Sequence, residues 1–339
     1  MRTPTAALIA CIALVAGGCS TRSGTTTTGA APRPGETAIR IGDEIVVAGR
    51  RFHTGAPVVL WTDPGGYDAY RVYQRFPSPA QLSEGHELDG EPRFNTRRVP
   101  GDEDQIARRR SGDWTLDELR EVVDQFVIHY DVCGTSRTCF RVLQDVRGLS
   151  VHFLLDVDGT IYQTLDLEER AWHATKANHR SIGIEIANIG AYAPEDAGVL
   201  DEWYATEETG TRMTLPPRFG DGGIRTTGFV ARPDRAERVR GTINGRELEM
   251  YDLTPEQHDS LAKLIATLNV VFPDIQIDAP RGTDGRVSDS VLSDDEFESF
   301  RGVIGHFHVQ ANKVDPGPAF DWERVLESAR TIRDQLSGE

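Results

Sequence analysis

Two histidines and one aspartate of this chain could together bind a zinc ion. His306 lies nine residues before Asp315, and Lys313 lies two residues before the aspartate. Far upstream, His129 ends an apolar run at residues 126–129. Two imidazoles and one carboxylate make a three-ligand zinc site whose fourth position stays free for water. This arrangement is typical of a metallohydrolase and not of a structural zinc site.

A neighbouring histidine competes for one of these positions. His308 follows His306 by two residues, and residues two apart in a β-strand point to the same face. The spacing therefore leaves both histidines open as ligands. A histidine at a strand end is also more often structural than metal-binding, so the assignment needs support from the rest of the sequence.

The elements that must position these residues predict an α/β fold with a mixed central β-sheet flanked by helices. Isoleucines at alternate positions face one side of a strand at residues 181–187, and Glu185 faces the other. A turn signal at residues 157–159 predicts a β-hairpin. Predicted strands cover residues 126–130, 151–156, 160–164, 181–187 and 302–306.

Helix start signals complete the pattern. Thr115 and Glu118 form a capping box, and Thr254 is followed by proline at the first helical position and by Gln257, which can reach back. Predicted helices therefore begin near residues 116 and 255, and two more cover residues 136–145 and the chain after Pro318.

The domain boundaries follow from composition. Residues 36–110 contain short strand patterns and turns, and we expect an N-terminal extension packed on a catalytic domain at residues 111–335. A long insertion at about residues 191–251 is rich in Gly, Pro and charge, which is typical of functional or loosely ordered segments. Histidines outside the candidate site are expected at the surface: His53, His86, His179 and His258.

The N-terminus resembles an export signal. Arg2 is its only charge, and residues 6–16 are too short an apolar run to span a bilayer permanently. The sequence VAGGC at residues 15–19 resembles a bacterial lipobox, so we expect removal of residues 1–18 and lipidation of Cys19. Ser20 resembles the outer-membrane class of Gram-negative lipoproteins, which face the periplasm. The alternative is an ordinary secretory signal in which the cysteine occurs by chance.

Residues 19–35 consist mainly of Thr, Gly, Ala and Pro and predict a flexible tether. The net charge is −16, and it becomes −17 once Arg2 is removed. Such an acidic chain lacks the basic face that nucleic-acid binding requires. It is equally unsuited to electrostatic docking on anionic lipid, so we expect membrane attachment through the lipid on Cys19 alone.

Five ordered motifs give the chain a family resemblance. They are FVIHYD at 126–131, VHFLLDVDGTIYQ at 151–163, WHA at 172–174, NHRSIGIEIAN at 178–188 and GHFHVQANKVDPGPAFDW at 305–322. Together they resemble the zinc-dependent N-acetylmuramoyl-L-alanine amidases of the type 2 family, which share their fold with peptidoglycan recognition proteins. The resemblance runs from about Trp114 to about Trp322, interrupted by the insertion.

The resemblance implies a role for each candidate residue. The Gly-His opening of the last motif selects His306 over His308, so the implied Zn²⁺ ligands are His129, His306 and Asp315. Glu185 matches the acid that moves the proton, and Lys313 matches a lysine that can stabilise an oxyanion.

Two further positions carry information from the family. His173 matches a cleft histidine that is expected to contact substrate. Phage-type and recognition-type members carry a tyrosine where this chain has Val151, and members that rely on the glutamate lack that tyrosine, so Val151 agrees with Glu185.

Cys11 leaves with the signal and Cys19 is the expected lipid site, so two other cysteines remain: Cys133 and Cys139, six residues apart and just after His129. In an oxidising compartment two nearby cysteines should form a disulfide, and peptidoglycan recognition proteins have one of similar spacing at this place. The alternative is a cysteine-containing metal site, for which no other soft ligand lies nearby.

The implied function is hydrolysis of the amide bond between N-acetylmuramic acid and L-alanine of peptidoglycan, by a water molecule that zinc activates. Two alternatives stay open. One is a non-catalytic module of the same fold that binds peptidoglycan, and the other is a metallohydrolase acting on a related amide.

Overall fold

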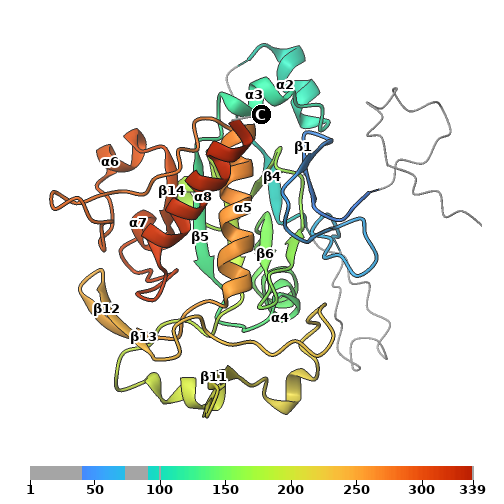
Figure 1. The fold of residues 1–339 in the computed structure, drawn as a ribbon. Coiled ribbons are helices and arrows are strands. Elements are labelled where there is room, and N and C mark those ends of the chain that lie inside the picture. Colours follow the sequence, from blue (N-terminus) through green and yellow to red (C-terminus); the bar gives the residue numbers. More distant parts are fainter. Residues whose placement is uncertain (1–39, 73–90, 99–100, 338–339) are drawn as a thin grey trace, which may run out of the picture. The chain divides into compact units, whose positions relative to one another are not determined.

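The computed structural model describes residues 40–72, 91–98 and 101–337 (Figure 1). Within the unit Arg40–Glu339, the largest sheet has six strands in the order β14-β5-β9-β6-β7-β3. Its neighbouring strands are parallel except for the β6–β7 hairpin, so the predicted α/β class with a mixed central sheet is confirmed. The strands are β3 (Val58–Leu60), β5 (Gln125–Tyr130), β6 (Phe153–Leu155), β7 (Ile161–Gln163), β9 (Ser181–Ile186) and β14 (Gly302–Gly305).

The two faces of this sheet have different tasks. Phe126 and Ile128 of β5 and the three isoleucines of β9 are fully buried in one cluster with apolar residues of helices α5 (Pro255–Val271) and α8 (Trp322–Ser337). Each such side chain contributes about 1.5–3 kcal/mol by leaving water. Because side chains alternate along a strand, His129 and Glu185 point to the opposite face. The core thus aims the candidate site residues away from α5 and α8.

The predicted helix starts are confirmed. The Thr254 hydroxyl accepts from the Gln257 amide, and the Gln257 side chain accepts from the Thr254 amide, at the start of α5. The capping box of Thr115 and Glu118 likewise begins α3 (Leu116–Arg120). The helix predicted at residues 136–145 is α4 (Ser136–Arg141) followed by the π-helical η1 (Val142–Arg147).

The chain before residue 111 adds elements to the same unit. Its strand β3 pairs in parallel with β7, while β1 (Glu44–Val47) and β2 (Arg50–His53) form a hairpin. Strand β4 (Phe94–Thr96) pairs with β8 (Glu169–Ala171). Helix α2 (Glu103–Arg110) was not predicted, because its only buried residue is Arg109 and it therefore has no apolar periodicity to recognise.

The insertion folds into two hairpins, with one short helix before the first hairpin and one between the two. The hairpins are β10 (Tyr204–Glu207) with β11 (Gly210–Met213), and β12 (Val239–Ile243) with β13 (Arg246–Met250). Trp203, Tyr204 and Tyr251 lie in a buried cluster that is separate from the main core. The remaining short helices are η2 (Thr175–His179), η3 (Ala197–Glu202), η4 (Pro217–Phe219), α6 (Asp294–Ser299) and α7 (His306–Val309).

The surface prediction for the other histidines is only partly right. His53 is exposed as predicted, and His86 lies outside the described residues. The prediction is wrong for His258, which is buried on α5 with its Nε2 3.1 Å from Asp252 Oδ1, and His179 is half-buried. The carboxylate partner of His258 comes from the segment directly before α5, which the helical periodicity of α5 alone does not reveal.

Candidate metal centre and active site

Three side chains from separate parts of the chain converge at the end of the sheet. His129 lies on β5, His306 directly follows the neighbouring strand β14, and Asp315 lies on the loop after α7. The Nδ1 atoms of both histidines and Oδ2 of Asp315 are each 2.9 Å from one another. All three residues are buried. These are the residues that the sequence predicted as zinc ligands.

The chemistry of this triangle fits a cation better than hydrogen bonds alone. Each Nδ1 atom carries at most one proton. If both atoms donate to Asp315, two N–H groups face each other across the contact between His129 and His306, and that contact cannot be a hydrogen bond. A cation between the three atoms would interact favourably with all of them. Two imidazoles and one carboxylate are a donor set that zinc accepts.

The electrostatic surroundings favour the protonation states that bind a metal. Burial, with a further effect of His306, lowers the pKa of His129 to about 4, so its imidazole is neutral near pH 7. Burial by itself would raise the pKa of Asp315, but His306 and the hydrogen bonds from both histidines hold that pKa below its ordinary value. Neutral imidazole and ionised carboxylate are the metal-binding forms.

The structure brings His306 into this group and leaves His308 out. The strand predicted at residues 302–306 ends at Gly305, and His306 begins the helical turn α7. In a helix, residues two apart point about 200° away from each other, so the expectation that both histidines share a face is wrong. His308 Nδ1 accepts from the Gly305 amide at 2.9 Å, and its Nε2 lies 2.8 Å from the Ser288 carbonyl. Both of its nitrogens are thus used for structure.

His173 holds the far side of the His129 ring. Its Nδ1 lies 3.0 Å from His129 Nε2, and its Nε2 lies 3.3 Å from Ser181 Oγ. The ring fits because residue 183 is glycine: a Cβ there would be 2.5 Å from the His173 ring. Such a partner fixes the orientation and tautomer of a metal-binding histidine. Sequence reasoning missed this contact; substrate contact by His173 stays a prediction.

Glu185 stands beside His129 on the neighbouring strand. The two residues are directly paired in the β5–β9 register. Oε2 of Glu185 is buried and has no hydrogen-bond partner among the described residues. Burial, with added repulsion from Asp315 and Asp131, raises the pKa of Glu185 well above its ordinary value. A carboxyl group with a raised pKa and one buried oxygen left without a partner is well suited to accept and release a proton.

A cavity of about 140 Å³ joins these groups. Lys313 lies in its wall with the predicted ligands, Glu185 and His173, so the structure collects every catalytic and metal-binding residue that the sequence predicted. The remaining lining residues are Tyr130, Asp131, Val132, Cys133, Cys139, Val142, Leu143, Arg147 and Leu149.

The two cysteines in this wall are free thiols in the structure, not the predicted disulfide. Their side chains are hydrogen-bonded to each other, and Cys139 is buried. The pair is therefore close enough to interact directly, and the disulfide stays a prediction for the exported protein.

We expect Cys133 and Cys139 of protein purified from an oxidising compartment to resist alkylation until a reductant is added. The bond would contribute about 2 kcal/mol by constraining the unfolded chain. Mass spectrometry of alkylated peptides, with and without reduction, measures this directly. Full labelling of both thiols in unreduced protein would contradict the prediction.

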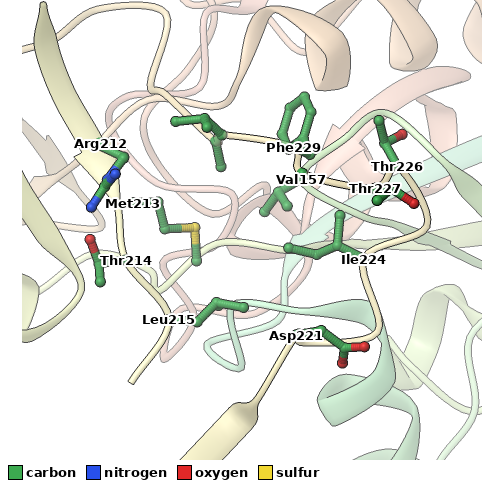
Figure 2. Close-up of a pocket in the computed structure, with 13 residues that line it drawn as sticks. Val157, Arg212, Met213, Thr214, Leu215, Asp221, Ile224, Thr226, Thr227 and Phe229 are labelled. Atoms are coloured by element: carbon green, nitrogen blue, oxygen red, sulfur yellow. The ribbon is translucent and has the colours of Figure 1, made fainter. Parts of the chain in front are cut away.

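A second cavity, of about 470 Å³, is lined by residues of the insertion together with Val157 from the turn between β6 and β7 (Figure 2). It shares no lining residue with the first cavity. Its charged residues are already paired, Arg212 with Glu207 and Asp221 with Arg137. We therefore place the chemistry in the first cavity.

The comparison with protein families shows which family the chain belongs to. A family model described as N-acetylmuramoyl-L-alanine amidase matches residues 119–318, which is more than half of the chain. The chain belongs to this family. The matched range contains all three predicted zinc ligands, Glu185 and Lys313, and it confirms the resemblance drawn from the five sequence motifs.

The similarity to individual proteins is low. An AmpD derivative is 16% identical with a TM-score of 0.32, over 78% of this chain and 98% of that one. AmiD from E. coli, solved with anhydro-N-acetylmuramic acid-L-Ala-D-gamma-Glu-L-Lys, is 16% identical with a TM-score of 0.34, over 76% and 70%. The amidase LysC from Clostridium intestinale URNW is 16% identical with a TM-score of 0.33, over 62% and 88%. No curated protein matches the chain.

Proposed function

We propose that this protein is a zinc-dependent N-acetylmuramoyl-L-alanine amidase, which hydrolyses the amide bond between N-acetylmuramic acid and L-alanine of peptidoglycan. The observation that carries the proposal is the convergence of His129, His306 and Asp315 beside Glu185, whose buried Oε2 has no hydrogen-bond partner among the described residues. Membership of the amidase family supports the choice of bond.

The three converging side chains would hold the metal ion. When bound, zinc supplies Lewis acidity, which polarises an amide carbonyl and lowers the pKa of water. Glu185 accepts a proton from the attacking water and delivers it to the leaving amine of L-alanine as the carbon–nitrogen bond breaks. Lys313 supplies positive charge where the carbonyl oxygen becomes an oxyanion, and His173 keeps the ring of His129 in place.

Two alternatives predict different outcomes when the protein is incubated with muropeptides. A binding module of the same fold would leave purified muropeptides intact, and another metallohydrolase would release a different fragment. We expect mass spectrometry to show free stem peptide and a peptide-free sugar after incubation with the zinc-loaded protein, and no products after treatment with a chelator. Intact substrate in the presence of zinc would favour the binding module.

We also propose that the mature protein is anchored by a lipid on Cys19 in the outer membrane, facing the periplasm. This proposal depends on the lipobox-like sequence, since Cys19 lies outside the described residues. Among the helices that the structure describes, none has both the length and the apolar character needed to cross a membrane.

We expect Cys19→Ala to move the protein from the membrane fraction to the soluble fraction without loss of amidase activity. The reason is that residues 19–35 precede the whole amidase family match and every candidate site residue. Fractionation followed by an activity assay measures both effects, with the wild type as control. A Cys19→Ala variant that stays in the membrane fraction would show that the anchor lies elsewhere.

A further inference from the structure

Two of the three candidate ligands lie on chain that is not part of the sheet. His306 begins the single helical turn α7, and Asp315 lies on the irregular loop that follows it. One backbone hydrogen bond joins these segments directly, from the Phe307 amide to the Asp315 carbonyl at 3.1 Å. A metal site requires its ligands to be held within about 0.5 Å of their binding positions. The segment that carries His306 and Asp315 therefore needs support from other parts of the protein.

The tip of the β12–β13 hairpin in the insertion supplies that support (Figure 1). The side-chain amide of Asn244 donates to the carbonyl of Phe307 at 3.2 Å and to the carbonyl of Lys313 at 3.0 Å. Its side-chain oxygen accepts from the Val291 amide at 2.7 Å. One side chain thus joins the segment after His306, the segment before Asp315 and a third loop.

The third loop supports the same region, because the Leu292 amide donates to the His308 carbonyl at 2.9 Å. The hairpin tip is itself held in place. The backbone amide of Asn244 donates to the Asp289 carbonyl at 2.9 Å, and Arg246 donates to the Asn312 carbonyl at 3.1 Å. Several hydrogen bonds around Asn244 therefore join the hairpin tip to the segment that carries His306 and Asp315.

Apolar packing adds to these hydrogen bonds. Ile243 and Leu248 of the hairpin form a buried cluster with Phe307, the residue directly after His306. Gly241 lies so close to Pro318 that a Cβ there would be 2.8 Å from the proline ring. The hairpin therefore contacts the ligand-bearing segment near both of its ends, at Phe307 and at Pro318.

We propose that Asn244 is a positioning residue for the candidate metal centre, through which the insertion sets the spacing between His306 and Asp315. The inference rests on the proposed function. Asparagine suits this position for two reasons. Its amide offers both the donors and the acceptor that the three segments need. It also tolerates the positive φ of 49° found there better than most residues.

Two substitutions test the proposal. Asn244→Asp keeps the shape and the acceptor, but it places an oxygen opposite the carbonyls of Phe307 and Lys313. Asn244→Gly keeps the backbone conformation and removes the side chain. We expect both variants to bind zinc about 10–100-fold more weakly than the wild type in a competition assay with a chelator. This is the usual cost of losing a partner that supports the ligands from outside the ligand shell.

Two controls separate positioning from general stability. Thr242→Ala changes an exposed side chain on the same hairpin, and Val325→Ala weakens the buried core on α8. Val325→Ala should lower the Tm of the metal-free protein and keep wild-type zinc affinity. The Asn244 variants should lose zinc affinity even where the Tm of the metal-free protein falls no further than in Val325→Ala. If both Asn244 variants bound zinc within about twofold of wild type, the positioning role of Asn244 would be overturned, but the proposed function would stand. A wild type that binds no zinc would overturn the proposed function as well.

Discussion

Replacing His306 with alanine should remove stoichiometric zinc and abolish amide hydrolysis together. The residue supplies one of three converging donor atoms, and without it only two remain, one from His129 and one from the buried carboxylate of Asp315. Loss of a partner outside the ligand shell already costs 10–100-fold in metal affinity, so loss of a ligand should cost more than about 100-fold. Metal analysis of the purified variant and release of stem peptide from muropeptides measure the two effects.

The same outcome is expected for His129→Ala and Asp315→Ala, and for wild type treated with a chelator, which added zinc should restore. His308→Ala is the matched control, since both of its ring nitrogens have other partners. It should keep stoichiometric zinc. If His308→Ala lost the metal and His306→Ala kept it, the ligand assignment would be wrong.

Changing Glu185 to glutamine should lower turnover by about 10²–10⁴-fold, the usual contribution of positioned acid–base catalysis. Glutamine has nearly the same shape but cannot accept a proton near neutral pH. Because Glu185 is not one of the three converging donors, zinc content and Tm should stay close to wild type. KM should change little, since the lost interaction acts mainly in the transition state.

Glu169→Gln is a suitable control for this experiment. Burial also raises the pKa of Glu169, to about 7, but this residue lies on β8 and does not line the cavity. Its substitution should leave turnover near wild type. If Glu185→Gln kept normal zinc and near-normal turnover, the proton would have to move through another group, and His173 is the next candidate because it also lines the cavity.

Much of the local structure is encoded in short stretches of sequence. Thr254, Pro255 and Gln257 specify the start of α5, because an N-cap, a proline and a reciprocal hydrogen bond act within four residues. The alternating isoleucines of β9 place Glu185 on the face opposite the core in the same way. Helix α2 was missed for the converse reason: it buries no apolar side chain whose spacing could reveal it.

The sequence by itself indicated the amidase family, the mixed α/β class and the residue types of the candidate metal centre, since motifs and periodicity are local properties. The family motif favoured His306 over His308, and the tertiary structure shows the physical reason: β14 ends at Gly305, so His306 and His308 lie on the helical turn α7 and point in different directions. Only the tertiary structure decided that His173 supports His129 and that Asn244 supports the ligand-bearing loop. These partners are 44 and 69 residues apart along the chain, so strand order and loop packing, which no local pattern records, bring them together.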